Sequence, residues 1–146
     1  MGHDDLSVDR KRESMNVAAV CIALLGLRIF GLGVNVSRLR GTMKIGIGYP
    51  ADPSDPLHKA CRAHANACEY APTMAILMLV VAMREPGAWA VVLFIAATGA
   101  RVLHAVGMLA SPTLAAGHPL RLVGAAGTYL TGVGLVLAAV LSTWVS

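Results

Sequence analysis

Four long apolar stretches constrain this chain more than any other feature of its sequence. They cover about residues 15–37, 58–84, 87–110 and 121–145. Each can cross a bilayer as a helix, because a hydrocarbon core of about 30 Å needs roughly 20 helical residues. Of the 146 residues, 56% are hydrophobic and only 14% charged, which is typical of a membrane protein. The stretches lack the alternation of a transmembrane barrel. The sequence therefore predicts an all-α, up-down-up-down four-helix membrane bundle over residues 15–146, preceded by a polar segment 1–14.

The second apolar stretch begins with a stripe of polar residues. At about 100° per residue, Arg62, Asn66 and Glu69 fall within an arc of roughly 60° on one helix face. A charged side chain at the bilayer centre costs about 2.5 to 3.5 kcal/mol, so this stripe needs partners or a ligand. Earlier in the chain, Arg28 lies in the middle of the first stretch, and its depth favours an interior partner over snorkelling to the surface.

Connectivity alone brings polar residues of all four stretches to one face of the membrane. These are the residues at the end of the first stretch, the start of the second, the end of the third and the start of the fourth. They are Arg38, Arg62, Asn66, Glu69, Tyr70, Arg101, His104 and Arg121. Four arginines around one carboxylate leave positive charge in excess, and arginine binds carboxylates in bidentate fashion. Two interpretations remain open: an anionic ligand, or a polar network that pins the helices together.

Other site types find little support in the sequence. Cys21, Cys61 and Cys68 fall within the expected helices and are interpreted as packing residues, and no cysteine or histidine spacing typical of a metal site is present. We therefore expect no metal. A nucleic-acid-binding protein would need a basic face with aromatic residues on a soluble fold, which this composition does not favour.

Residues 62–72 resemble the Arg-Ala-x-x-Asn-x-x-Glu-x-x-Pro signature of the MAPEG superfamily, the membrane-associated proteins of eicosanoid and glutathione metabolism. Residues 100–107 are similar to the Arg-x-x-His stretch of the family's third helix, and residues 119–121 resemble the segment that leads into its fourth. The resemblance covers nearly the whole chain. It implies a homotrimer of four-helix subunits that binds glutathione, as co-substrate, between neighbouring subunits.

The resemblance also implies roles for individual residues. Glutathione would be held by Arg62, Asn66, Glu69 and Tyr70, with Arg38 and Arg101 as carboxylate partners and His104 as an orienting hydrogen-bond partner. Arg121 would stabilise the glutathione thiolate, which would attack a lipophilic electrophile or lipid hydroperoxide arriving from the bilayer. The chain departs from several active relatives in having Met108 in place of a tyrosine, and Tyr129 is a possible substitute phenol.

Three classes of function compete. The first is a glutathione transferase or peroxidase, and the second is a non-enzymatic relative that binds a lipid or a partner protein. Retention of all four arginines favours the first. An ion pathway is disfavoured, because the second half of the second stretch is wholly apolar. The compact loops fit a protein of a bacterial inner membrane.

Overall fold

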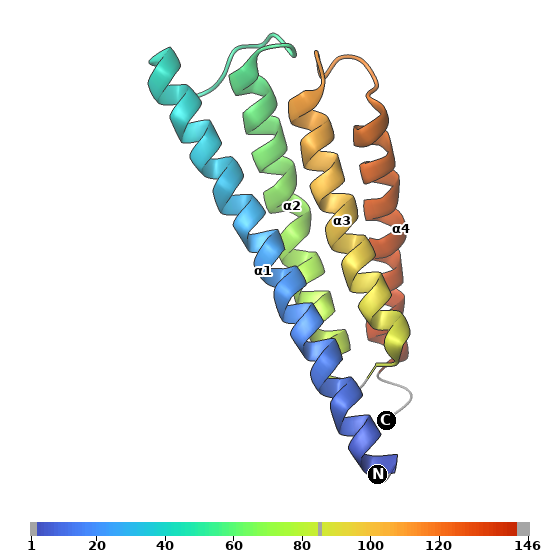
Figure 1. Cartoon of the computed structure of the whole chain (residues 1–146). Coiled ribbons are helices and arrows are strands. Elements are labelled where there is room, and N and C mark those ends of the chain that lie inside the picture. Colours follow the sequence, from blue (N-terminus) through green and yellow to red (C-terminus); the bar gives the residue numbers. More distant parts are fainter. Residues whose placement is uncertain (1–2, 85, 143–146) are drawn as a thin grey trace.

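The fold consists of long helices joined by short connections (Figure 1). The computed structural model describes residues 3–84 and 86–142. These residues form α1 (His3–Met43), α2 (Pro56–Ala82), α3 (Ala88–Ala110) and α4 (Pro119–Leu141). All four helices are long and apolar enough to cross a membrane.

The first helix is longer at both ends than its apolar stretch predicts. We expected a helix over about residues 15–37, whereas α1 runs from His3 to Met43. No proline occurs in this range and half of the added residues are good helix formers, so the hydrogen-bonded backbone continues beyond the apolar segment. The helix ends where Lys44 adopts a left-handed backbone conformation with φ of 54°. The following loop is therefore residues 44–55, shorter than expected.

The other helix starts follow from local sequence. Asp55 caps α2, because its carboxylate accepts hydrogen bonds from the backbone N–H groups of Leu57 and His58 at 2.8 and 3.0 Å. Proline occupies the first turn of both α2 and α4, where its missing N–H costs nothing. Helix α2 continues through its internal Pro72. Residues 143–145 of the expected fourth helix and Glu85 of the turn before the third lie outside the described residues.

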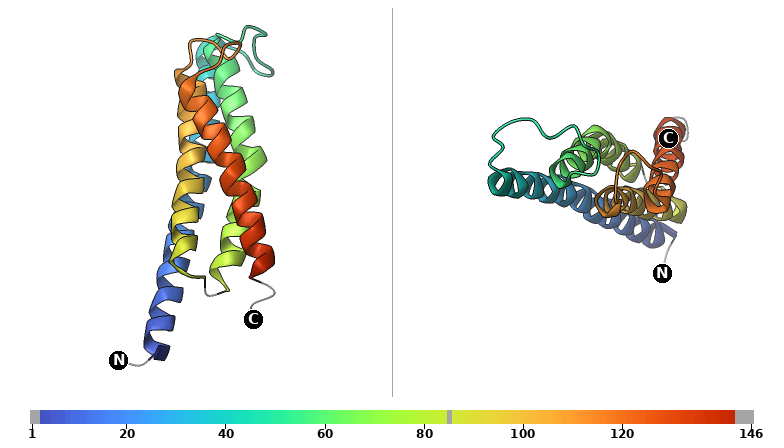
Figure 2. Two further views of the ribbon diagram at one scale, coloured as in Figure 1. Left: turned by 90° about the vertical axis from the view of Figure 1, so that its right-hand side faces the viewer. Right: turned by 90° about the horizontal axis from the view of Figure 1, so that it is seen from above.

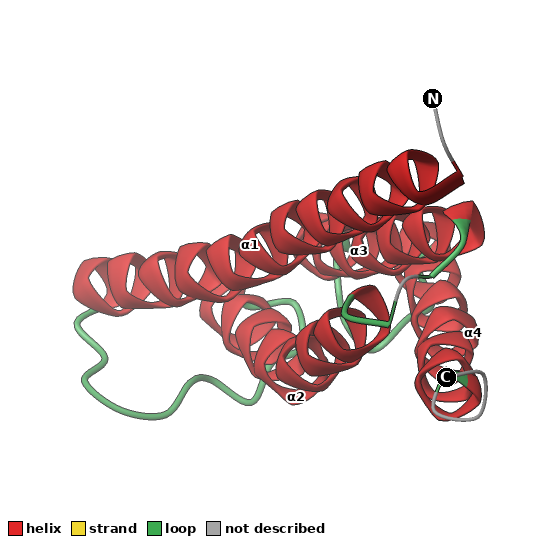
Figure 3. Ribbon diagram, turned by 90° about the horizontal axis from the view of Figure 1, so that it is seen from below, coloured by secondary structure: helices red, strands yellow, loops and turns green. Residues whose placement is uncertain are grey.

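Consecutive helices run in opposite directions, so the 44–55 and 111–118 loops lie together at one end of the bundle (Figure 1). We call this the loop end. Helix α1 packs on α2 and α3, and α4 packs on α3 and α2, whereas α1 and α4 share no close backbone contact within the described chain. The carboxyl-terminal end of α1 stands apart from the other helices at the loop end, as Figures 2 and 3 show.

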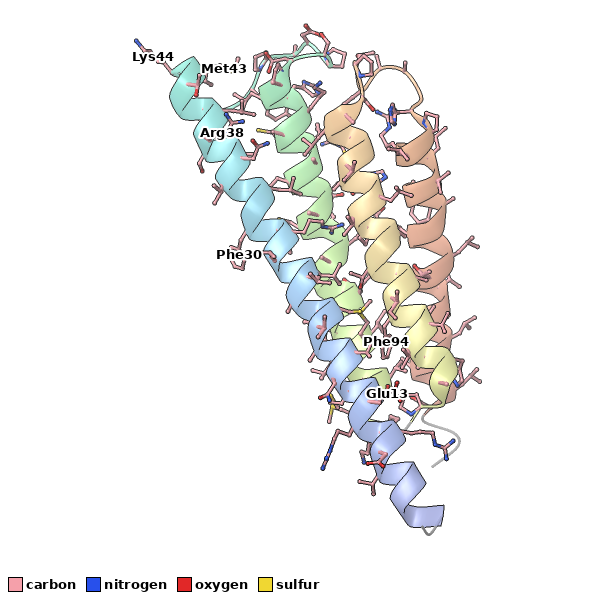
Figure 4. The ribbon with its side chains drawn as sticks, viewed as in Figure 1. Glu13, Phe30, Arg38, Met43, Lys44 and Phe94 are labelled. Carbon is pink, nitrogen blue, oxygen red and sulfur yellow. The ribbon has the colours of Figure 1, made fainter. Side chains whose placement is uncertain are left out.

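The interior divides into two clusters of buried apolar residues. The larger draws on all four helices and contains Leu25, Met78, Phe94 and Leu135, each no more than 1% exposed. Phe94 lies in the half of the bundle away from the loop end (Figure 4). The smaller cluster is nearer the loop end. It consists of three alanines and two larger residues from α1, α2 and α3, namely Leu32, Ala63, Ala67, Ala105 and Met108. Of the polar site residues, Tyr70 packs against the larger cluster.

Candidate functional site

Arg101 is the centre of a polar cluster that links three helices. It lies on α3 and is only 2% exposed. One guanidinium nitrogen donates to Asn66 of α2, to the side-chain Oδ1 at 2.6 Å and to the backbone oxygen at 3.0 Å. The other terminal nitrogen donates to Oγ1 of Thr128 on α4 at 3.3 Å. Hydrogen bonds to a charged donor are the stronger kind, so these contacts tie α2, α3 and α4 at one level.

Two tyrosines extend this cluster toward the surface. The guanidinium carbon of Arg101 lies 4.9 Å from the ring centre of Tyr70, a cation–π contact. The hydroxyl groups of Tyr70 and Tyr129 are 3.3 Å apart, within hydrogen-bonding distance. Beside them runs an apolar groove of about 450 Å³ between α2 and α4, lined by Glu69 and by side chains such as Leu77. A polar cluster thus borders an apolar groove.

Helices α3 and α4 approach each other closely at the loop end because glycines face the contact. A Cβ atom on Gly124 would lie 2.6 Å from the Cα of His104, and one on Gly107 would lie 2.9 Å from the Cα of Arg121. In this contact the Nδ1–H of His104 donates to the backbone oxygen of Arg121 at 2.9 Å. This bond fixes the tautomer of the neutral imidazole and leaves Nε2 as its acceptor nitrogen.

The side chain of Arg121 turns toward the 111–118 loop. Its guanidinium donates to the backbone oxygens of Leu114 at 3.2 Å and Ala116 at 2.7 Å. The same loop is joined to the 44–55 loop, because the N–H of Leu114 donates to the oxygen of Pro53 at 2.9 Å. In this structure Arg121 therefore holds the loop that covers the end of α3 and α4.

The remaining predicted site residues lie on the surface of the chain. Arg62 and Glu69 are exposed on α2, and within the described chain no hydrogen bond or ion pair joins either of them to another residue. Arg38 is exposed on the diverging end of α1, where it donates to Oδ1 of Asn35 at 3.0 Å (Figure 4). The fold thus brings Asn66, Tyr70 and Arg101 together and leaves the other three charged residues facing outward.

Sequence reasoning missed two features of this site. Thr128 accepts from Arg101, and its place among the small residues of the fourth stretch gave no signal of that role. Arg28 is half-buried, and its three guanidinium nitrogens are shielded from solvent but lack a hydrogen-bond partner in the described chain, where we expected an interior partner. Among the described residues, no group of three or more histidine, cysteine, aspartate or glutamate side chains could hold a metal ion.

The helices and the charged groups within them define an integral membrane protein whose polar site is set in an apolar bundle. The MAPEG family model matches residues 18–141, which is most of the chain. The protein belongs to the MAPEG family, which confirms the resemblance drawn from residues 62–72 and 100–107. This is in general a family of membrane proteins with glutathione-related transferase and peroxidase activities. No curated protein sequence matches the chain.

Proposed function

We propose that this protein is a membrane-embedded glutathione-dependent transferase or peroxidase. The observation that carries the proposal is the state of the polar stripe on α2. Asn66 and Tyr70 are held in place by Arg101, whereas Arg62 and Glu69 on the same helix are exposed, and within the described chain no hydrogen bond or ion pair joins either to another residue. Ordered polar groups beside unpaired charges of both signs are what a small zwitterionic ligand requires.

Glutathione has the complementary charges. It carries two carboxylates, one ammonium group and a thiol. Arginine pairs with carboxylates in bidentate fashion, which suits Arg62, and Glu69 is an acceptor for the ammonium group. The amide of Asn66 and the hydroxyl of Tyr70 offer hydrogen bonds to the peptide backbone. The family to which the chain belongs supports this ligand over other anions.

A neighbouring subunit would complete such a site. Arg62 and Glu69 are exposed on the surface of the chain, and Arg38 stands on the part of α1 that diverges from the bundle. In a homotrimer, Arg38 of one copy would be available to a carboxylate bound on α2 of the next. The oligomer and the shared site are parts of the same proposal.

The proposed chemistry is attack by the glutathione thiolate. A thiol with a pKa of about 8.5 is mostly protonated at neutral pH, so a nearby guanidinium is needed to favour the thiolate. We assign this role to Arg121, whose guanidinium would give up one hydrogen bond to a carbonyl oxygen of the 111–118 loop and contact the sulfur instead. Attack on an electrophilic carbon gives a thioether. Attack on a lipid hydroperoxide breaks its O–O bond and gives the alcohol and glutathione sulfenic acid, which a second glutathione converts to glutathione disulfide and water.

The apolar groove between α2 and α4 offers a place for the lipophilic substrate, because it borders Glu69 and Tyr70. Met108 is buried in the smaller apolar cluster, so no phenol stands at that position. The Tyr129 hydroxyl lies at the groove, and we propose it as the phenol that donates a hydrogen bond to the reacting atoms.

Titration calorimetry of glutathione on the detergent-purified protein tests the proposal. We expect binding that weakens at least about tenfold in Arg62→Ala, since a hydrogen-bonded charge pair contributes about 1.5–3 kcal/mol. Arg12→Ala, which removes an exposed arginine far from the stripe, is the matched control and should bind as the natural protein does. Failure of the natural protein to bind glutathione would overturn the proposal in favour of a lipid- or partner-binding relative.

A further inference from the structure

A second polar pocket lies at the end of the bundle away from the loops, and the proposed glutathione chemistry does not use it. It has a volume of about 590 Å³ and is lined by residues of all four helices and of the turn between α2 and α3. Helices α2 and α4 end here and α3 begins here (Figure 1). Because the helices span the apolar layer, a pocket at their ends lies where the bilayer meets water.

The charges around this pocket are positive. Lys11 of α1 and Arg84 of the turn both line it and are both exposed, and none of its described lining residues is acidic. An arginine can form two parallel hydrogen bonds with a phosphate group, and a lysine acts on it as a point charge. No side chain caps the start of α3 at Gly87, so the N–H groups of its first turn add partial positive charge. The pocket therefore suits an anionic group.

Trp89 gives the pocket the character of a membrane interface. An added Cβ on Gly87 would lie 3.0 Å from Cδ1 of the indole and 3.2 Å from its Nε1, so the glycine lets the ring pack against the turn. The side chain is 54% exposed, and within the described chain no hydrogen bond uses its Nε1–H. Tryptophan is enriched at bilayer surfaces because its ring is apolar and its N–H group is polar. Here that N–H group is available to a lipid oxygen.

The rest of the pocket is largely apolar. The buried Val81 lines it, together with Met83 and Leu141, which are 59% and 62% exposed. A free phosphate ion would gain nothing from these side chains. A phospholipid would use both parts of the pocket, since its phosphate would meet the cations and its chains the apolar surface. Basic pockets between transmembrane helices are known to suit the head groups of anionic lipids.

We propose that this pocket binds an anionic phospholipid from the leaflet away from the loop end. The phosphate oxygens accept hydrogen bonds from Arg84 and Lys11, and the indole N–H of Trp89 donates to an ester oxygen of the lipid. The first carbons of an acyl chain contact Met83 and Leu141. Because Lys11 belongs to α1 and Arg84 follows α2, one bound phosphate joins these two parts of the chain. The site does not depend on glutathione.

Quenching of tryptophan fluorescence by brominated lipids tests this proposal. The chain has two tryptophans, so Trp144→Phe leaves Trp89 as the single fluorophore. This protein is reconstituted in phosphatidylcholine vesicles that contain increasing fractions of dibrominated phosphatidylglycerol or dibrominated phosphatidylcholine. Bromine quenches only at short range, so the two curves give the relative affinity for the two lipids. We expect at least about tenfold preference for phosphatidylglycerol, and a loss of about fivefold in Lys11→Gln or Arg84→Gln.

A matched pair of double variants separates a built site from general attraction to a basic surface. Lys11→Gln/Arg84→Gln should abolish the preference. Arg12→Gln/Lys44→Gln removes the same charge from exposed positions outside the pocket and should retain it. Excess inorganic phosphate should leave the preference unchanged. Equal loss in the two double variants, displacement by phosphate alone, or no preference in the protein with both cations would overturn the proposal.

Discussion

The two ends of the bundle are held together in different ways. Away from the loop end, large apolar side chains from all four helices interlock, among them Met78, Phe94 and Leu135. Toward the loop end, the buried apolar cluster consists mostly of alanines and includes no residue of α4. There the hydrogen bonds of Arg101 and the close approach of α3 and α4 at glycines add to this smaller cluster.

This difference shows how a membrane bundle can carry charge without losing its shape. In lipid, helices associate through van der Waals packing and interhelical hydrogen bonds, because the lipid tails are as apolar as leucine. The end away from the loops relies on large packed side chains, and the loop end combines smaller packed residues with interhelical hydrogen bonds. The groove between α2 and α4 borders both parts of the bundle, because it is lined by Tyr70 and Tyr129 and also by Met74 of the larger apolar cluster. Four predictions test the comparison.

Phe94→Ala should have the largest effect, because it empties the centre of the packed end. We expect the free energy of unfolding to fall by about 3–5 kcal/mol. Ile95→Ala, at the neighbouring exposed position, is the control and should cost much less. Unfolding by a denaturing detergent in mixed micelles measures both. Glutathione affinity of the folded Phe94→Ala protein should stay within about twofold of the natural value, and a large loss would contradict the separation of the two ends.

Gly124→Ala should come next, because the new methyl group would meet the backbone of His104. Overpacking of this kind costs about 1–3 kcal/mol. Gly132→Ala is the matched control on the same helix, since a Cβ there meets nothing within 4 Å and the substitution removes a helix-destabilising glycine. Equal stability of the two variants would show that α3 and α4 do not depend on this close approach.

Arg101→Lys should reduce stability by about 1–2 kcal/mol and also weaken glutathione binding. Lysine keeps the charge but cannot form the two-branched contact with Asn66 and Thr128. Arg12→Lys provides the control, and the same unfolding and calorimetric measurements apply. Weaker binding with unchanged stability would mean that the cluster serves the ligand alone and does not join the helices.

Tyr129→Phe should have the smallest effect on stability, about 0.5 kcal/mol, because it removes only the hydroxyl contact with Tyr70. Tyr49→Phe is the control: the Tyr49 ring contacts His58 beside the 44–55 loop. Turnover with a lipophilic electrophile should fall severalfold in Tyr129→Phe alone. Unchanged turnover would exclude this phenol from the proposed reaction.

The sequence predicts the helices well and their ends poorly. Hydropathy marks the residues that suit a bilayer, but a helix stops only where the backbone is forced to change. Residues 38–43 and 3–14 contain no such signal, so α1 continues through both. Where capping chemistry is strong, as at Asp55 and Pro56, the predicted start differs from the observed one by only two residues.

The level of the site residues along the bundle axis can be predicted from the sequence, but the inclination of the helices that carry them cannot. Spacing along α2 and α3 brings Asn66 and Arg101 to the same level, and the structure joins them. The same reasoning brings Arg38 to that level, yet α1 diverges from the bundle and carries it away. Helix inclination depends on packing against neighbours, which spacing does not encode. The inclination of α1 also determines which side chains surround Arg28. The lack of a hydrogen-bond partner for its guanidinium therefore could not be predicted from spacing either.

The length of α1 has a consequence for the orientation of the protein in its membrane. Its 41 residues extend about 60 Å, whereas a bilayer with its headgroups is about 40–45 Å thick. Helix α1 runs past the other helices at the end away from the loops (Figure 2), and Arg10, Lys11 and Arg12 follow one another in the early part of this helix. We expect these trypsin sites to be accessible from the water on that side of the membrane. Cleavage there by protease added outside sealed membranes reports directly which compartment the loop end faces.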